Sequence, residues 1–311
     1  MVKLAMGFKI AIQINTRKIF NKLSSHKYPE TKGGWCKPIK NHIIGGQHAG
    51  DLFDPFVIKF DSKYLMFLSS RKKNGIVLYE SRDGIGWDYV KDVLISNTEN
   101  ESINRASILM TPKGLWRLYY TRQTMNKSDI CLIESTNYLN FKSENTVCCL
   151  EHNACVMNPH VLWDSDSLEY KMWFSSGDMY EPDEIYYATS ISGINWEVLS
   201  NPVLKKEKKE KYRKCKVGGC YVKKQNDRTY EMYYIGYQNI DTSSICHAVS
   251  NDGINWTQDD CNPIISPSLK SWDADSVYKP SYLFDNNREM IWYNGRKRKQ
   301  ECIGIAIKIP R

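Results

Sequence analysis

A seven-residue pattern recurs three times along this 311-residue chain and limits its fold more than any other feature. The pattern reads Ser-x-(Asp or Ser)-Gly-Ile-x-Trp and occupies residues 81–87, 190–196 and 250–256. A degraded copy at 135–141 keeps the serine, a turn-forming asparagine and a terminal aromatic ring. The copies are spaced by about 54 to 60 residues, which is longer than most solenoid repeats and close to a propeller blade.

Each copy combines a turn with an aromatic anchor. The glycine supplies the positive φ that a tight hairpin turn needs, and the tryptophan after it can pack into the seam against the next repeat. The pattern therefore indicates repeated antiparallel units that are packed side by side.

Short aromatic runs precede these turns and mark five units. The runs begin at Tyr64, Leu115, Tyr170, Tyr230 and Glu289, and each follows a shorter apolar run. Such a unit is typical of a four-stranded antiparallel blade. We predict an all-β fold, a five-bladed β-propeller around a central channel. Its blades span approximately 50–97, 98–150, 151–203, 204–262 and 263–311.

The fifth unit ends without its own turn and tryptophan. The N-terminal segment, residues 1–49, could therefore close the ring, and the alternating stretch 8–14 is the candidate strand.

Composition fits a soluble globular protein. Hydrophobic residues make up 41% of the chain and charged residues 25%, with a net charge of +8. No apolar run reaches the roughly 20 residues that span a bilayer, so no membrane span is expected. The ten cysteines follow no repeated spacing, which favours reduced thiols, and lysines interrupt the apolar N-terminus; a cytoplasmic location is expected.

Three motifs together resemble a known group of proteins. They are Asp-Pro-x-Val from Asp54, Tyr-x-Met-(Trp or Phe) in the aromatic runs, and the repeated turn. The combination resembles the five-bladed propellers of the glycoside hydrolase superfamily of families 32, 43, 68 and 130. The resemblance extends from about Asp51 to Ile307. A fold does not fix a reaction, so activity must be argued from the site.

In a propeller the first strand of each blade lines the central channel. Aligning these strands gives a column of residues at the channel: Asp54, Arg105, Asn158, Gly218 and Lys279. Strand alternation places a second column one step deeper: Phe56, Ser107, His160, Cys220 and Ser281. Buried charges are costly unless they are paired, so the charged members either neutralise one another or await a ligand.

The resemblance implies three acidic residues, at the first strands of blades one, two and three. Asp54 matches the general base or nucleophile, but Arg105 and Asn158 stand where the other two acids are expected. Glycosidic hydrolysis normally needs a second carboxylate to protonate the leaving group. Loop carboxylates could replace it, or could simply be solvated: Asp178, Glu181, Asp183, Glu184, Asp273 and Asp275.

Basic residues at the ends of second strands suggest an electropositive channel mouth. Arg71, Arg122 and Arg296 join Arg105 and Lys279 there, although exposed arginines at strand ends also serve solubility. A guanidinium matches phosphate or carboxylate oxygens, so the ligand would be a sugar phosphate, a nucleotide-sugar, a sugar acid or inorganic phosphate. Asn158, His160 and His48 would form hydrogen bonds with the sugar, although the two histidines could equally be satisfied core residues.

Two further signals carry less weight. Cys148-Cys149-x-x-His152-x-x-Cys155 has zinc-ligand residue types, but its spacing is not that of a standard pair of zinc knuckles and favours a cysteine-rich buried loop. The mixed charges of 205–216 and the basic stretch 296–299 come with no nucleic-acid-binding motif, so no nucleic-acid partner is expected. No cofactor is expected, and a central calcium ion is left open.

The sequence thus favours a carbohydrate-active enzyme resembling family 43 glycosidases. It would cleave or transfer a glycosidic bond in an anionic or phosphorylated sugar, in glycan biosynthesis or salvage. Two alternatives are a non-catalytic sugar-binding propeller and a transferase that depends on nucleotide-sugars or phosphate.

Overall fold

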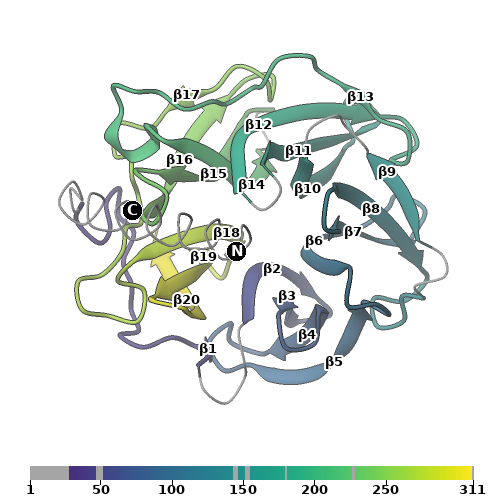
Figure 1. The fold of residues 1–311 in the computed structure, drawn as a ribbon, viewed down its shortest axis with the longest axis horizontal. Coiled ribbons are helices and arrows are strands. Elements are labelled where there is room, and N and C mark those ends of the chain that lie inside the picture. Colours follow the sequence, from purple (N-terminus) through teal and green to yellow (C-terminus); the bar gives the residue numbers. More distant parts are fainter. Residues whose placement is uncertain are drawn as a thin grey trace, which may run out of the picture.

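The structure, a computed structural model, describes residues 28–46, 52–142, 146–150, 155–178, 181–225 and 228–309, with Glu181 as backbone only. Five four-stranded antiparallel sheets surround a central axis (Figure 1), which confirms the predicted five-bladed β-propeller. These ranges contain no α-helix; one short 3-10 turn, η2 (Lys211–Arg213), connects blades three and four. No helix within them has the length and apolar character to cross a membrane.

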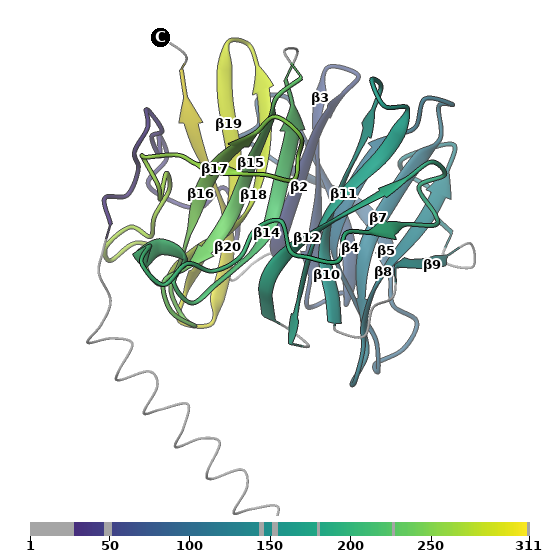
Figure 2. The same ribbon diagram turned by 90° about the horizontal axis from the view of Figure 1, so that it is seen from above.

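Each blade follows the chain outward from the axis. Blades one and two comprise β2 (Leu52–Phe60), β3 (Lys63–Ser70), β4 (Gly75–Ser81), β5 (Asp88–Ile95), β6 (Ser102–Met110), β7 (Trp116–Gln123), β8 (Ser128–Ser135) and β9 (Val147–Leu150). Blades three and four comprise β10 (Cys155–Asp164), β11 (Glu169–Asp178), β12 (Glu181–Ser190), β13 (Glu197–Val198), β14 (Lys216–Lys224), β15 (Tyr230–Tyr237), β16 (Ser243–Ser250) and β17 (Thr257–Gln258). Blade five comprises β18 (Ser276–Asp285), β19 (Arg288–Lys297), β20 (Gln300–Lys308) and β1 (Ile44–Gly45). Figure 2 shows the blades from the side.

Blade five combines strands from both ends of the chain. Its outer strand β1 pairs antiparallel with β20, so that Ile44 faces Ile303. The stretch 8–14 lies outside the described residues. Closing the last sheet with an N-terminal strand pairs β20 on both sides and so avoids an exposed edge.

The hydrophobic core is divided among the seams between blades. Each of five apolar clusters draws its residues from two neighbouring sheets, including blades one and five across the closure. Alternate residues of the second strands supply large rings to these clusters, such as the fully buried Trp173 and Trp292. Aromatic side chains bury large areas, which explains the aromatic runs in the sequence.

The repeated turn joins the third and fourth strands of its blade and is held by its own side chains. Ser81 Oγ accepts a hydrogen bond from the Gly84 N–H at 2.9 Å, and Asp83 Oδ1 accepts one from the Ile85 N–H at 2.8 Å. Ser250 and Asp252 repeat the same contacts in blade four.

The same turn fastens one blade to its neighbour. Its glycine carbonyl accepts a hydrogen bond from a ring on the second strand of the preceding blade: Trp292 Nε1 to Gly84 at 2.9 Å, Tyr119 Oη to Gly193 at 2.8 Å and Trp173 Nε1 to Gly253 at 2.8 Å. The motif tryptophan stacks edge-on against that ring, as Trp87 does on Trp292 at 6.1 Å. The predicted seam position is confirmed, but the expected direction was wrong, since the ring packs on the preceding blade.

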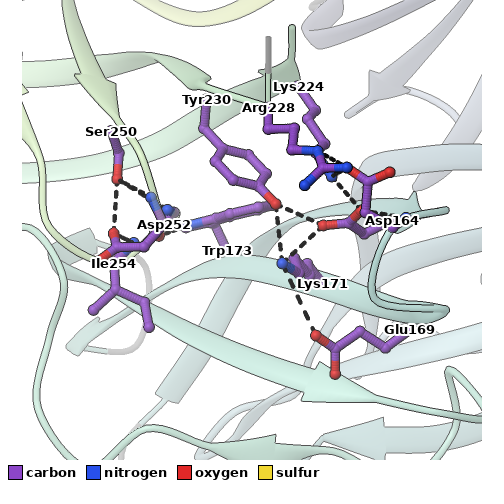
Figure 3. A network of polar contacts seen from close by, with 12 residues as sticks. Asp164, Glu169, Lys171, Trp173, Lys224, Arg228, Tyr230, Ser250, Asp252 and Ile254 are labelled. Atoms are coloured by element: carbon purple, nitrogen blue, oxygen red, sulfur yellow. Dashed lines mark hydrogen bonds and ion pairs between the residues drawn. The ribbon is translucent and has the colours of Figure 1, made fainter. Parts of the chain in front are cut away.

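A second contact fastens blades three and four next to the repeated turn, since Tyr230 pairs with Ser250, the first residue of that turn (Figure 3). The buried Asp164 accepts hydrogen bonds from Tyr230 Oη at 2.6 Å and from Lys224, and pairs with Lys171 Nζ at 2.8 Å. These donors hold the pKa of Asp164 well below its usual range although burial opposes them. Tyr64 donates to Asp285 in the same way between blades one and five. We call this contact the tyrosine-aspartate lock.

Candidate functional site

Each innermost strand is interrupted by a β-bulge at the same height. The bulged residue has a φ between 46° and 59°, in the left-handed region; these residues are Asp54, Arg105, Asn158, Gly219 and Lys279. A bulge re-aims the side chain that it carries. Four members of the predicted column therefore come together around the axis.

The fourth member was predicted one residue too early. The register of blade four shifts between Gly218 and Tyr221, so the left-handed position is Gly219, and Tyr221 takes the deeper place assigned to Cys220. Both candidate residues are glycines, and the sequence offers no side chain that distinguishes them.

Polar side chains of the preceding blade accept hydrogen bonds from the backbone of the bulged residues. The N–H groups of four bulged residues donate to side-chain oxygens: Asp54 to Asn294 Oδ1 (2.9 Å), Arg105 to Ser69 Oγ (2.8 Å), Asn158 to Thr121 Oγ1 (3.1 Å) and Gly219 to Ser175 Oγ (2.9 Å). These second-strand residues were not identified from the sequence. The sequence feature that could identify them is a small polar residue near the end of each aromatic run.

The axial charges comprise one carboxylate and two cations. Asp54 is 4% exposed, and Arg105 Nε lies 3.5 Å from its Oδ2. Lys279 is 2% exposed. Burial raises the pKa of Asp54 while Arg105 and Lys279 oppose the rise; burial lowers the pKa of Lys279 while Asp54 opposes it. The axial group thus combines one carboxylate with two basic side chains, and burial acts against the charged forms of Asp54 and Lys279.

A second carboxylate lies next to this group and was missed. Glu301, at the start of β20, is buried, pairs with Arg71 at 2.8 Å and accepts a hydrogen bond from Tyr278 Oη. Its charge acts to raise the pKa of Asp54. The Arg71 guanidinium stacks 4.3 Å over the ring of Phe53. Of the three strand-end arginines, Arg71 is thus held beside the axial group, and no sequence motif marked Glu301.

Two amides add neutral polar atoms. Asn158 Nδ2 reaches Ser175 Oγ at 3.4 Å. Asn294 Nδ2 is buried and has no hydrogen-bond partner within the described part of the chain. A buried unpaired donor costs free energy, so it is a natural contact for a ligand oxygen.

Beneath the charged group, the axis is filled by rings. His160 lies 4.5 Å from the ring of Tyr221 and 5.9 Å from that of Phe56. Its Nε2 contacts the Val222 carbonyl oxygen at 2.6 Å, and its Nδ1 has no partner among the described residues. Burial lowers the pKa of His160 to about 3.

This burial makes stability depend on pH. His160 stays neutral in the folded protein but takes up a proton in the unfolded chain below about pH 6.5, so stability falls as pH falls from 6.5 toward 3. At pH 5 the loss from this group is about 2 kcal/mol relative to pH 7.5. We expect His160→Gln, which keeps a donor for Val222, to lack that part of the loss in urea titrations at the two pH values. Equal losses in both proteins would contradict the assignment.

The other predicted residues are held in separate contacts. Arg122 pairs with Asp129 at 3.4 Å, and Arg296 donates to the Asp241 carbonyl at 2.9 Å. Asp273 is buried against Lys37 at 2.6 Å. Asp275 accepts a hydrogen bond from the Arg298 N–H. His48 lies outside the described residues.

The start of β12 contacts the bulge of blade four. A Cβ added to Gly218 would lie 2.3 Å from Pro182 Cβ, so Pro182 packs directly beside the bulge of blade four. Asp178 is exposed, and Asp183 pairs with Lys206 at 3.4 Å. Glu181 and Asp183 are the sequence neighbours of this proline.

The cysteines show no assembled metal site. All ten are free thiols, and Cys148 and Cys149 face the Ile130 carbonyl oxygen. Among the described residues no three His, Cys, Asp or Glu side chains are grouped to hold a metal ion. His152 lies outside them.

Comparison with known proteins places the chain in a family. Residues 47–251 match the profile of glycosyl hydrolases family 43. The chain belongs to this family. No curated protein matches this chain.

Solved structures share its fold at low sequence identity. A thermostable family-43 glycoside hydrolase has a TM-score of 0.69 and 18% identity, with 84% of this chain and 92% of that one covered. An N-acetylgalactosamine deacetylase from F. plautii, in complex with blood group B trisaccharide, has a TM-score of 0.71 and 14% identity, with 91% and 94% covered. A GH130 structure from work on mannoside phosphorylases and hydrolases has a TM-score of 0.63 and 14% identity, with 92% and 94% covered. These neighbours differ in reaction, so the family 43 chain must be judged by its own site.

Proposed function

We propose that this family 43 propeller binds a carbohydrate with an anionic group at its axial site and cleaves or transfers a glycosidic bond there. Asp54 would be the base or nucleophile, and Arg105 and Lys279 would hold the anionic group. The observation that carries the proposal is a buried carboxylate with one buried and one partly buried cation at one set of bulges. Left-handed non-glycine residues cost free energy and gather at functional sites.

An ordinary hydrolytic mechanism needs a second carboxylate to act with Asp54. Two carboxylates are needed, and Arg105 and Asn158 replace the acids that the resemblance leads one to expect. Glu301 and the carboxylates flanking Pro182 are the residues to test as proton donors. A cytoplasmic role in glycan biosynthesis or salvage belongs to the same proposal and is supported by the ten free thiols.

The same replacements favour a second candidate function. A propeller that kept its axial pocket of charges but lost its acids would bind an anionic glycan without turnover. The difference between the candidates is chemical activity, and both require the anion to bind.

Anion binding is tested by thermal shift against sugar acids, sugar phosphates, inorganic phosphate and the matching neutral sugars. We expect only the charged ligands to raise the Tm, because a ligand that binds only the folded state stabilises it, by about 2.7 kcal/mol at a hundredfold excess over Kd.

Arg105→Ala should remove this shift, whereas Arg82→Ala, at an exposed turn position with the same loss of charge, should retain it. A shift of equal size in both variants would show that the anion binds elsewhere and would overturn the proposal.

A further inference from the structure

The seam between blades four and five lacks the tyrosine-aspartate lock. The position of Tyr64, Tyr170 and Tyr230 is occupied in blade five by Glu289, and the position of Asp164 and Asp285 is occupied in blade four by Gln225. Glu289 pairs with Lys308 at 3.2 Å, within its own sheet. Glu289 and Gln225 therefore do not form the tyrosine-aspartate lock that is present in the two neighbouring seams.

The repeated turn, which fastens a blade to the preceding one, is also missing from this seam. Tyr233 has the place that Trp173 and Trp292 have in other blades, but its hydroxyl donates to Glu231 Oε2 at 2.9 Å rather than to a motif glycine. Blade five has no such turn because its outer strand β1 comes from the other end of the chain. Trp35 replaces only the motif tryptophan: it stands edge-on to Tyr233 at 6.1 Å and 84°, as Trp87 does to Trp292.

A cavity of about 420 Å³ is found at this place. Its size is within the range of small-ligand sites. Trp35, Tyr233, Tyr282 and Phe284 contribute to its wall, and the Tyr233 and Tyr282 rings stack at 4.8 Å. The cavity lies where β14 ends and β15 begins, whereas the axial bulge lies near the start of β14. The two sites are thus separated along β14.

A chain of polar contacts runs along the cavity. Lys223 Nζ contacts Tyr282 Oη at 2.9 Å and Glu231 at 3.1 Å. His247 lies between two carboxylates, with Nε2 at 3.3 Å from Glu231 and Nδ1 at 2.9 Å from Asp259. Three carboxylates of the wall thus face two lysines, with a histidine among them, so the net charge of the wall does not exceed one unit.

We infer that this cavity is a second carbohydrate site, for an uncharged sugar. Balanced charges give no net attraction to an anion or a cation, while alternating donors and acceptors match sugar hydroxyl groups. Aromatic faces suit the apolar C–H faces of a sugar ring. The axial proposal requires an anionic ligand, so the two sites differ in ligand class and can be tested separately.

The test is saturation-transfer NMR of the full chain with glucose, galactose, mannose and N-acetylglucosamine at millimolar concentration. Val249→Trp fills the cavity from an exposed position of its wall, and Phe284→Ala removes an exposed ring without touching the polar chain. Ile191→Ala is the matched control, an exposed apolar residue in blade three.

At least one of these sugars should bind to the wild type, to Ile191→Ala and to Asp54→Asn. Its signal should vanish in Val249→Trp and its Kd should rise about tenfold in Phe284→Ala. If Val249→Trp fails to fold, Phe284→Ala alone decides the matter. Binding that persists unchanged in the folded variants, or that is lost in Asp54→Asn, would overturn the inference, as would no binding by any of the four sugars.

Discussion

Asp54→Asn is expected to reduce turnover of a glycoside substrate by about 10² to 10⁴-fold, the usual contribution of a positioned acid-base group. Asparagine has the same shape as aspartate but can neither accept a proton nor attack the sugar. The substitution also leaves the buried Lys279 and the partly buried Arg105 without their carboxylate, which lowers stability. Turnover should therefore be measured well below the Tm of the variant, with binding followed separately by calorimetry.

The comparison of turnover with affinity separates the two candidate functions. An enzyme loses kcat in Asp54→Asn while much of its ligand affinity remains. Glu301→Gln and Glu181→Gln, measured beside it, test the proton donor. Turnover within tenfold of the wild type in Asp54→Asn would exclude the assigned role. A wild type that binds charged glycans but turns none over would establish the binding propeller.

Gly84→Ala is expected to destabilise the fold by about 3 kcal/mol, since it adds left-handed strain to overpacking. Gly84 has a φ of +78°, and a Cβ there would lie 2.9 Å from Cζ2 of the fully buried Trp292. That ring also donates the hydrogen bond which fastens blade five to blade one. Urea titration should show a lower midpoint with an unchanged m-value, and the Tm should drop by roughly 6 to 12 °C.

Two other glycines provide matched controls for this substitution. Gly114 has the same φ of +78° but nothing within 4 Å of an added Cβ, so Gly114→Ala isolates the backbone strain at about 1 kcal/mol. Gly86 lies in the same turn as Gly84 without a left-handed φ, and its Cβ would meet only Asp83 Oδ1 at 3.9 Å. Gly86→Ala should change stability very little. If Gly84→Ala costs no more than Gly114→Ala, the contact with Trp292 does not hold the seam.

The candidate site was partly predictable because its residues have fixed places in a repeated unit. Asp54, Arg105, Asn158 and Lys279 are equivalent positions of successive blades, and counting from the repeats finds them. Glu301 and Asn294 belong to other strands of blade five and carry no motif, so only the folded ring brings them beside Asp54. The loop carboxylates could not be ranked from the sequence, since their distance from the axis depends on how each loop turns.

The repeated turn and the five aromatic runs determined the blade, the number of blades and the antiparallel order, because their residues act within short stretches of chain. Tertiary structure decided what depends on contacts between blades. It selected Gly219 rather than Gly218 as the bulged residue, placed each tryptophan against the preceding blade, and left a cavity where blade five lacks its turn. Local hydrogen bonds specify a turn from its own residues, whereas a seam is specified only when two distant strands meet.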